Sequence, residues 1–286
     1  MSPRIDAHQH FWKLARGDYR WLRPELAPLY RDFGPEHLAP LRARHGIDGS
    51  VLVQAADSVA ETEYLLSLAA QDATILGVVG WVDFESPDAP DTLERLARHP
   101  KLVGVRPMIQ DIPDARWMLR DTLAPAFAAL VELNLAFDAL VKPPHLPHLV
   151  RLVDRHPDLR VVIDHGAKPV ISAGERWPAR AAWREDLRAL AAHPRLHCKL
   201  SGLVTEASPA WNEREIAPFA HELVEIFTPQ RTMWGSDWPV VELAGGYSRW
   251  HDSSHALFSG LHEGERRALF GATAADFYGL SWTPPS

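Results

Sequence analysis

Two histidines stand one residue apart near the start of the chain, within the stretch DAHQHFW. An imidazole can hold a divalent metal ion or polarise a carbonyl group, and a carboxylate close by can take a proton from water. Side chains alternate between the two faces of a strand, which predicts that Asp6, His8 and His10 share one face. The pair therefore indicates a metal site or a hydrolytic site, with a structural role for buried histidines as the alternative.

Reactive side chains also stand at the ends of other short apolar runs. His165 closes the run RVVIDH, Asp237 closes TMWGSD, and Arg106 ends LVGVRP. Gln54 ends SVLVQA, and Lys199 lies within LHCKLSG. Three histidines and a carboxylate that converge on one place would suit a divalent metal such as zinc. The plain alternatives are a helix N-cap for Asp237, an ion pair for Arg106 and a solubilising charge for Lys199.

The alternation of side chains assigns faces to two of these runs. It predicts that His165 shares a face with Val161 and Ile163. It also predicts that Asp237 aligns with Gly235. Both reactive side chains would then project from the carboxyl ends of their strands.

Short apolar runs alternate with longer helical patterns along the whole sequence. The predicted strands are RIDAHQH, SVLVQA, ILGVVGW, LVGVRP, LAFDAL, RVVIDH, LHCKLSG and TMWGSD, and the predicted helices are 34–45, 61–71, 88–98, 124–133, 145–155, 179–192, 213–227 and 263–278. Eight such units without a linker predict an α/β fold, a single-domain (β/α)8 TIM barrel over residues 1–286. A doubly wound open sheet is the alternative, but no strand leads into a glycine-rich nucleotide loop. In such a barrel the active site lies at the carboxyl ends of the strands.

Composition narrows the class of protein. The formal charge of −7 gives no basic footprint for nucleic acid or for an acidic membrane surface. The one cysteine, Cys198, excludes an internal disulfide and a cysteine-rich zinc cluster. No run resembles a signal peptide or a membrane span, so a cytoplasmic protein acting on a small molecule is expected, with an oligomer left open.

The stretches DAHQHFW, VIDHGAKP, CKLSGLVTE and MWGSDWP together resemble the amidohydrolase superfamily. More narrowly they resemble its sugar-lactone hydrolases, the L-fuconolactonase-like and L-rhamnonolactonase-like enzymes, from the first predicted strand to the eighth. The resemblance implies that Asp237 activates the hydrolytic water. It implies that His8, His10 and His165 hold a divalent metal or polarise the lactone carbonyl, and that Arg106 contacts the substrate.

The sequence departs from the superfamily at two positions. Many members carry a metal-binding histidine after the fifth strand and a lysine or glutamate on the fourth. Here the fifth run holds Asp138 and the fourth ends in Arg106, which argues against a two-metal site. One metal ion, zinc foremost, held by the first-strand histidines and Asp237 with or without His165, is compatible with these residues. A metal-free site is equally compatible with them.

The predicted activity is hydrolysis of a sugar lactone to the sugar acid. Asp237 would take a proton from water, and His8, His10 or a bound cation would stabilise the oxyanion. His165 or a nearby acid would protonate the leaving ring oxygen. One alternative is a non-oxidative decarboxylase of the same superfamily, which would need a tightly bound metal. The other is a barrel that binds a small ligand without turnover, which has no need of a water-activating carboxylate.

Substrate specificity is expected from the loops that follow the strands. The long loop 11–32 carries Trp12 and Trp21, which could stack on a sugar face or simply pin the loop to the barrel. The segment 238–255, with glycines at 245 and 246, is expected to be a loop that closes over the site. Glu206 is a further candidate residue. The expected substrate contacts are Trp12, Gln54, Arg106, Lys168 and Lys199.

Overall fold

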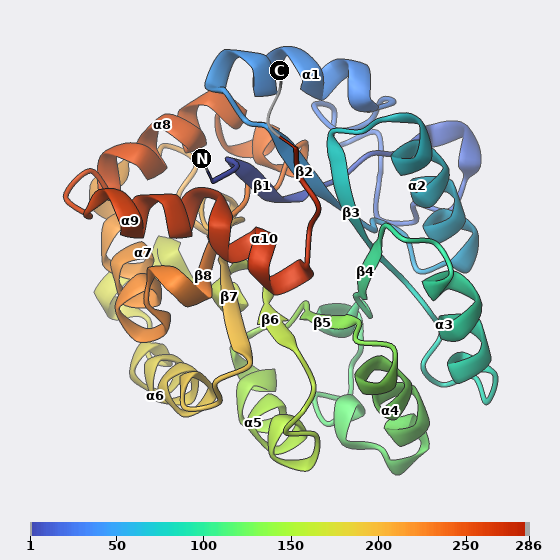
Figure 1. The fold of residues 1–286 in the computed structure, drawn as a ribbon. Helices are drawn as coiled ribbons and strands as arrows, with labels where there is room; N and C mark the ends of the chain where they lie inside the picture. The colour runs from blue at the N-terminus through green and yellow to red at the C-terminus, as the bar shows by residue number, and fades with distance from the viewer. Residues whose placement is uncertain (1, 284–286) are drawn as a thin grey trace.

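Eight parallel strands close into a barrel in the computed structural model, which describes residues 2–283 (Figure 1). Each strand pairs with the next one along the chain. The last and first strands are joined by a bridge between Gln9 and Trp238, where the His10 amide donates to the Trp238 carbonyl over 2.7 Å. The predicted (β/α)8 barrel is confirmed. The strands are β1 (Ile5–Gln9), β2 (Gly49–Val53), β3 (Ile75–Gly80), β4 (Leu102–Val105), β5 (Ala136–Ala139), β6 (Val161–Ile163), β7 (Leu196–Leu200) and β8 (Thr232–Trp234).

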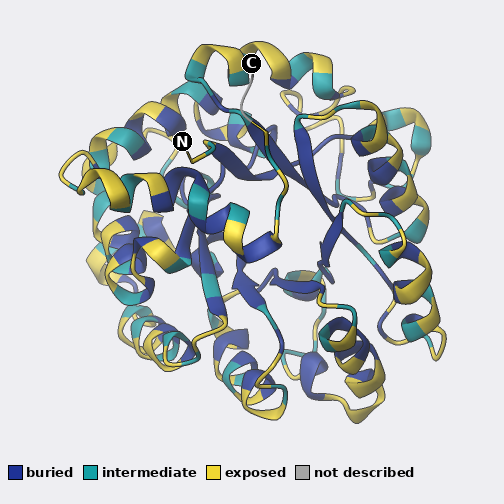
Figure 2. Ribbon diagram, viewed as in Figure 1, coloured by how far each residue is buried: buried dark blue, intermediate teal, exposed yellow. Residues whose placement is uncertain are grey.

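A ring of helices surrounds the strands and exposes its outer faces, while the strands are buried (Figure 2). Seven of the predicted helices begin and end within two residues of the observed ones. The helices are α1 (Pro35–His45), α2 (Val59–Gln71), α3 (Ala89–Ala97), α4 (Ala124–Glu132), α5 (Leu146–Arg155), α6 (Arg180–Ala191), α7 (Glu213–Phe227), α8 (Tyr247–Leu257), α9 (Glu263–Arg267) and α10 (Thr273–Tyr278).

Two predicted segments differ from the structure near the end of the chain. The segment 238–255 is not one loop, because its second half, from Tyr247, belongs to the eighth barrel helix, α8, which buries Tyr247 and Trp250. The helix expected over 263–278 is divided into α9 and α10 by a π-helical turn at Ala268–Ala272. The backbone of Phe270 and Gly271 leaves helical geometry in that turn, so α10 takes a new direction.

The helix α10 covers the end of the barrel at which the strands begin (Figure 1). Its Phe277 and Tyr278 pack with Ile5 of β1, Val162 of β6 and Met233 of β8 in one buried cluster that fills the barrel interior. Burial of large apolar side chains is the main favourable term in folding. The barrel is therefore a packed core at this end, and polar side chains collect toward the other end.

Lys199 of β7 carries a fully buried ammonium group between this cluster and the barrel mouth. Its Nζ atom lies 2.5 Å from Asp138 Oδ2, 3.0 Å from Asp164 Oδ1 and 3.1 Å from His8 Nδ1. The Tyr278 hydroxyl donates to Asp138 Oδ2 over 2.7 Å. Buried charges persist only where they are paired and hydrogen-bonded. Lys199 therefore compensates the carboxylates of Asp138 in β5 and of Asp164 just after β6. The structure places Lys199 beneath the mouth and not among the side chains that line the pocket.

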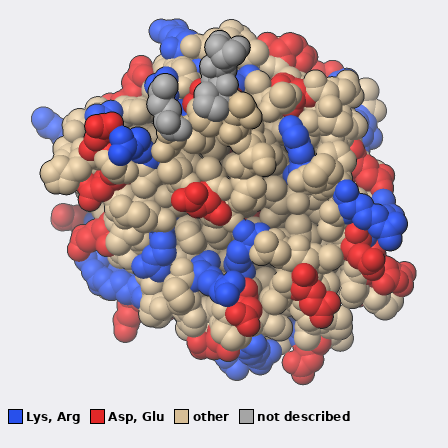
Figure 3. Space-filling model, viewed as in Figure 1, with Lys and Arg blue, Asp and Glu red and all other residues tan. Residues whose placement is uncertain are grey.

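Charged side chains of both signs are interspersed around the face that α10 covers (Figure 3). Within residues 2–283, no helix combines the length and the apolar character that crossing a membrane requires.

Replacement of Lys199 by methionine is expected to lower the free energy of unfolding by about 3–5 kcal/mol, because Asp138 would stay buried without its cation and Asp164 would keep only Arg106. Lys168→Met is the matched control. Its ammonium is partly exposed and stands 3.8 Å from Glu206, so its loss should cost less than about 1 kcal/mol. Urea denaturation of both variants measures the difference, and equal losses would contradict the compensating role of Lys199.

Candidate active site

Asp237 follows β8 at the barrel mouth and is held there by its backbone. Its amide donates to the His8 carbonyl over 2.8 Å, and its φ of +58° is left-handed, a conformation that aspartate tolerates better than most residues. The Asp6 carboxylate accepts the amide proton of Ser236 over 2.8 Å. These contacts join the end of β8 to β1 and fix where the Asp237 side chain begins.

Strict alternation had predicted that Asp6 shares the face of His8, but it does not. Asp6 bonds the backbone that follows β8, whereas the His8 ring lies inside the barrel against Lys199. The pairing of β1 with β2 is irregular between Asp6 and Gln9. A bulge of this kind breaks the period of two, so residues on either side of it no longer alternate.

The first-strand histidines both reach Asp237. His10 Nε2 lies 3.4 Å and His8 Nε2 3.7 Å from Asp237 Oδ1, and the two Nε2 atoms lie 3.2 Å apart. His10 Nδ1 lies 2.8 Å from the Val53 carbonyl, which can only accept a hydrogen bond. The proton of neutral His10 therefore sits on Nδ1, and its Nε2 lone pair faces the site.

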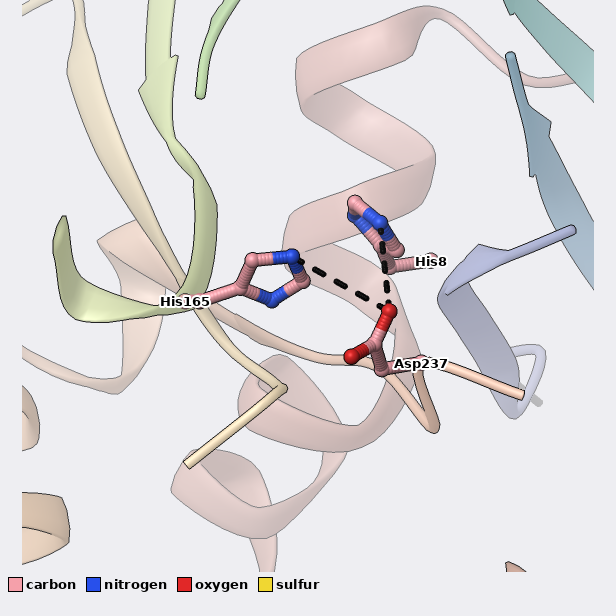
Figure 4. Close-up of side chains that lie close together, drawn as sticks. All are labelled: His8, His165 and Asp237. Carbon is pink, nitrogen blue, oxygen red and sulfur yellow. Dashed lines mark ion pairs between the residues drawn. The ribbon is translucent and has the colours of Figure 1, made fainter. Parts of the chain in front are cut away.

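His165 approaches Asp237 from the other side of the mouth (Figure 4). Its Nε2 atom lies 3.9 Å from Asp237 Oδ1, and its Nδ1 atom lies 2.9 Å from Ser201 Oγ. A side chain at Gly202 would meet His165 Nδ1 at 2.4 Å, so only glycine leaves room for the ring. His165 thus stands at the end of β6, as its position in the run indicated.

The route by which His165 reaches the mouth differs from the predicted one. Val161 and Ile163 pack outward against the helices, while Val162 packs in the barrel interior. Alternation therefore turns Asp164 inward, and His165 enters the mouth through a left-handed turn with φ of +55°. Left-handed backbone continues through Lys168, and such strain concentrates at functional sites.

Asp164 and Gln54 together hold Arg106 at the pocket wall. Arg106 Nη1 donates to Asp164 Oδ2 over 3.2 Å, and its Nη2 donates to the Gln54 carbonyl over 2.5 Å. The Gln54 side-chain amide donates in turn to the Arg106 carbonyl over 2.6 Å. Arg106 Nη1 also lies 3.5 Å from His8 Nε2. Gln54 is fully buried, so it supports Arg106 and does not reach into the pocket.

The surroundings set the protonation states of the mouth residues. Burial alone would raise the pKa of Asp237, but the nearby rings of His165, His10 and His8 more than offset it, and the pKa falls below its usual range. Burial lowers the pKa of His165 to about 4 and that of His8 well below its usual value. At neutral pH the site therefore presents an ionised carboxylate beside the neutral rings of His8 and His165, which is the state that water activation requires.

These side chains surround a pocket of about 250 Å³ at the carboxyl ends of the strands. Lys168 reaches it, but Trp12 does not, because Trp12 is fully buried and donates to the Arg31 carbonyl. Trp12 therefore pins the first loop, while Trp21 faces the pocket. The pocket is lined by His10, Trp21, Ala55, Arg106, Met108, Gln110, Asp111, Leu140, His165, Lys168, Asp237 and Val240.

Asp164 is the residue that sequence reasoning missed. It is fully buried, and it joins Lys199, Arg106 and the His8 Nδ1 atom, 3.4 Å away. Burial would raise its pKa, but Lys199 and His8 outweigh burial and hold the pKa well below the usual value. The alternation of side chains could have identified Asp164, because a residue two positions after the inward-facing Val162 should also face inward.

The donor atoms of the mouth fit a single divalent metal. In a tetrahedral zinc site with bonds of about 2.1 Å, ligand atoms lie roughly 3.3 Å apart. The separations of 3.2, 3.4 and 3.7 Å among His8 Nε2, His10 Nε2 and Asp237 Oδ1 match that spacing. Donor atoms of His8, His165 and Asp237 also lie within 4.8 Å of one another.

Comparison with known proteins identifies the family of this chain. The amidohydrolase family model matches residues 5–280. An L-fucono-1,5-lactonase of Burkholderia ambifaria is 44% identical, over 97% of this chain and 96% of its own length. An L-fucono-1,5-lactonase of Burkholderia multivorans is 40% identical, with the same shares covered.

A solved structure has a similar backbone. An amidohydrolase from Burkholderia multivorans, crystallised with bound zinc, superposes with a TM-score of 0.91 at 38% identity. The superposition covers 98% of this chain and 100% of that one. From its family match, its relatives and its barrel, this chain belongs to the amidohydrolase family.

Proposed function

We propose that this amidohydrolase opens a sugar lactone to the sugar acid, with L-fucono-1,5-lactone as the first substrate to test. The observation that carries the proposal is the ionised Asp237, with three imidazoles and the Arg106 guanidinium grouped around one pocket. The two L-fucono-1,5-lactonases that resemble the chain over nearly its whole length support the same substrate class.

Asp237 takes the proton of the attacking water in this proposal. The oxygen of that water forms a bond to the lactone carbonyl carbon, and the carbonyl becomes an oxyanion. A carboxylate with a low pKa is a weak base, so proton transfer alone supplies a modest part of the acceleration. The larger part must come from groups that stabilise the oxyanion.

Arg106 is the group best placed to stabilise the oxyanion. A guanidinium is positively charged at every working pH, and Arg106 is held by Gln54 and Asp164 before substrate arrives. Electrostatic stabilisation by preorganised groups in a water-poor site is usually the largest single contribution to catalysis. His8 and His10 complete the polar wall on the same side.

The leaving ring oxygen receives its proton from Asp237. His165 or a nearby acid was expected in this role, but a pKa of about 4 keeps the His165 ring neutral at pH 7, so almost no imidazolium is present to donate a proton. The proton that Asp237 took from water is available as the bond from the carbonyl carbon to the ring oxygen breaks. His165, fixed by Ser201, orients the Asp237 carboxylate during both transfers.

A metal ion would bind among the same residues, namely His8, His10, His165 and Asp237. When bound there, zinc would supply Lewis acidity toward the lactone carbonyl. The permanent charge of Arg106, 3.5 Å from His8 Nε2, offers the same polarisation from the chain itself.

Asp237→Asn is expected to lower kcat for lactone hydrolysis by about 10²–10⁴-fold, because the variant lacks the base for water. The assay is a panel of six-carbon sugar 1,5- and 1,4-lactones that includes L-fuconolactone and L-rhamnonolactone. Glu206→Gln, altered in a carboxylate that lies outside the pocket lining, is the control. A folded Asp237→Asn variant with full activity would exclude the assigned role.

The pH dependence of kcat/KM should have its acidic limb near pH 4 or below. Above that limb Asp237 is ionised and His165 is neutral, and the rate is lost as the pH falls and both groups gain a proton. Initial rates from pH 3 to 8, measured by direct quantification of the sugar acid, define the limb. A limb near 6.5, the value of an ordinary histidine, would contradict these protonation states.

Activity is expected to survive dialysis against a chelator, because Arg106 and the imidazoles remain in place. Metal content and turnover are measured on the same samples before and after dialysis. Turnover that disappears with the metal and returns with zinc would instead make the first-strand histidines ligands of a required ion.

A further inference from the structure

A second group of imidazoles lies between the helices α1 and α8, and none of its members lines the mouth pocket. His45 is the last residue of α1, while His251 and Asp252 belong to α8. His251 Nδ1 lies 2.9 Å and His45 Nδ1 3.6 Å from the same oxygen, Asp252 Oδ1. One donor atom from each of the three residues lies within 4.8 Å of the other two.

The hydrogen bond of His45 engages Nε2 and leaves Nδ1 available to bind a metal ion. Its Nε2 atom lies 2.8 Å from Ser248 Oγ, one turn earlier in α8 than Asp252. When Nε2 donates to that hydroxyl, Nδ1 keeps its lone pair and faces Asp252. Metal-binding histidines are typically oriented in this way, through a hydrogen bond from the nitrogen that does not bind the metal.

The two histidine side chains are buried and the aspartate side chain is exposed, an arrangement that suits a metal site. The His45 and His251 side chains are only 7% and 11% exposed, so their rings are held in place by packing. The Asp252 side chain is 70% exposed, which gives an ion a path from solvent and leaves positions for water.

We propose that His45, His251 and Asp252 form a second metal site, distinct from the barrel mouth, that binds a divalent transition metal with zinc in first place. Two imidazole nitrogens and one carboxylate oxygen are donors that zinc accepts, with water completing the tetrahedron. The ion joins α1, the first helix of the ring, to α8, which follows the last strand. Its occupancy therefore stabilises the barrel where its two ends meet.

The test uses Asp252→Asn, because the exposed side chain can change without disturbing the fold. Equilibrium dialysis against zinc alone should find one bound ion fewer per chain in this variant than in the unaltered protein, whatever the mouth binds. Asp154→Asn is the matched control. Asp154 stands 3.4 Å from His193 in a similar exposed pair, and this pair belongs to no group of three donors within residues 2–283.

Two further measurements make the result decisive. Zinc at about 100 times its Kd should raise the Tm of the unaltered protein by about 5 °C more than that of Asp252→Asn. A crystal grown with zinc should show an anomalous peak beside His45 Nδ1. Equal zinc content and equal Tm shifts in all three proteins would overturn the proposal. Lactone turnover should be unchanged in Asp252→Asn, so failure of the proposed activity leaves this test unaffected.

Discussion

The ammonium of Lys199, surrounded by Asp138, Asp164 and His8, is the interaction on which the barrel mouth depends. Two carboxyl groups buried in a barrel need partners that offset their lost hydration, and the Lys199 ammonium touches both of them. Asp164 then has an oxygen available for Arg106, and His8 is held from below through Nδ1. A continuous chain of charge pairs thus connects the apolar cluster under α10 with the pocket.

The mouth is assembled mainly from groups whose orientation is fixed before substrate arrives. His10 is fixed by the Val53 carbonyl and His165 by Ser201 and the close backbone of Gly202. Asp237 and His165 both leave their strands through left-handed residues. Such a site pays little reorganisation when charge develops on a substrate oxygen, which favours electrostatic catalysis over strong proton transfer. This balance agrees with a carboxylate whose pKa is low.

Much of the architecture could be predicted from the sequence, because strand and helix periods differ. Proline also cannot continue a helix, and a His-Pro pair follows three of the predicted helices, at 99–100, 156–157 and 193–194. The reactive ends of the strands were equally visible, since polar residues are conspicuous after apolar runs. Alternation failed at Asp6 and His165, where a bulge and a left-handed turn depend on contacts with distant strands. Lys199 and Gln54 looked like substrate contacts because their burial depends on partners that only the closed barrel supplies. The helix α8 was predicted to be a loop because two glycines precede it and its many polar residues obscure the apolar periodicity of a helix.

The seam between β1 and β8 has a consequence for how the protein is made. The His8 carbonyl bonds the amide of Asp237, and the His10 amide bonds the carbonyl of Trp238, so the two halves of the mouth are separated by most of the chain. Contacts of such long sequence separation form late in folding, and synthesis runs from the N-terminus. A nascent chain must therefore carry its first strand, with an unpaired edge, until the eighth strand has emerged. Because β1 and the segment after β8 both supply residues of the mouth, the mouth is complete only once the ring of strands has closed.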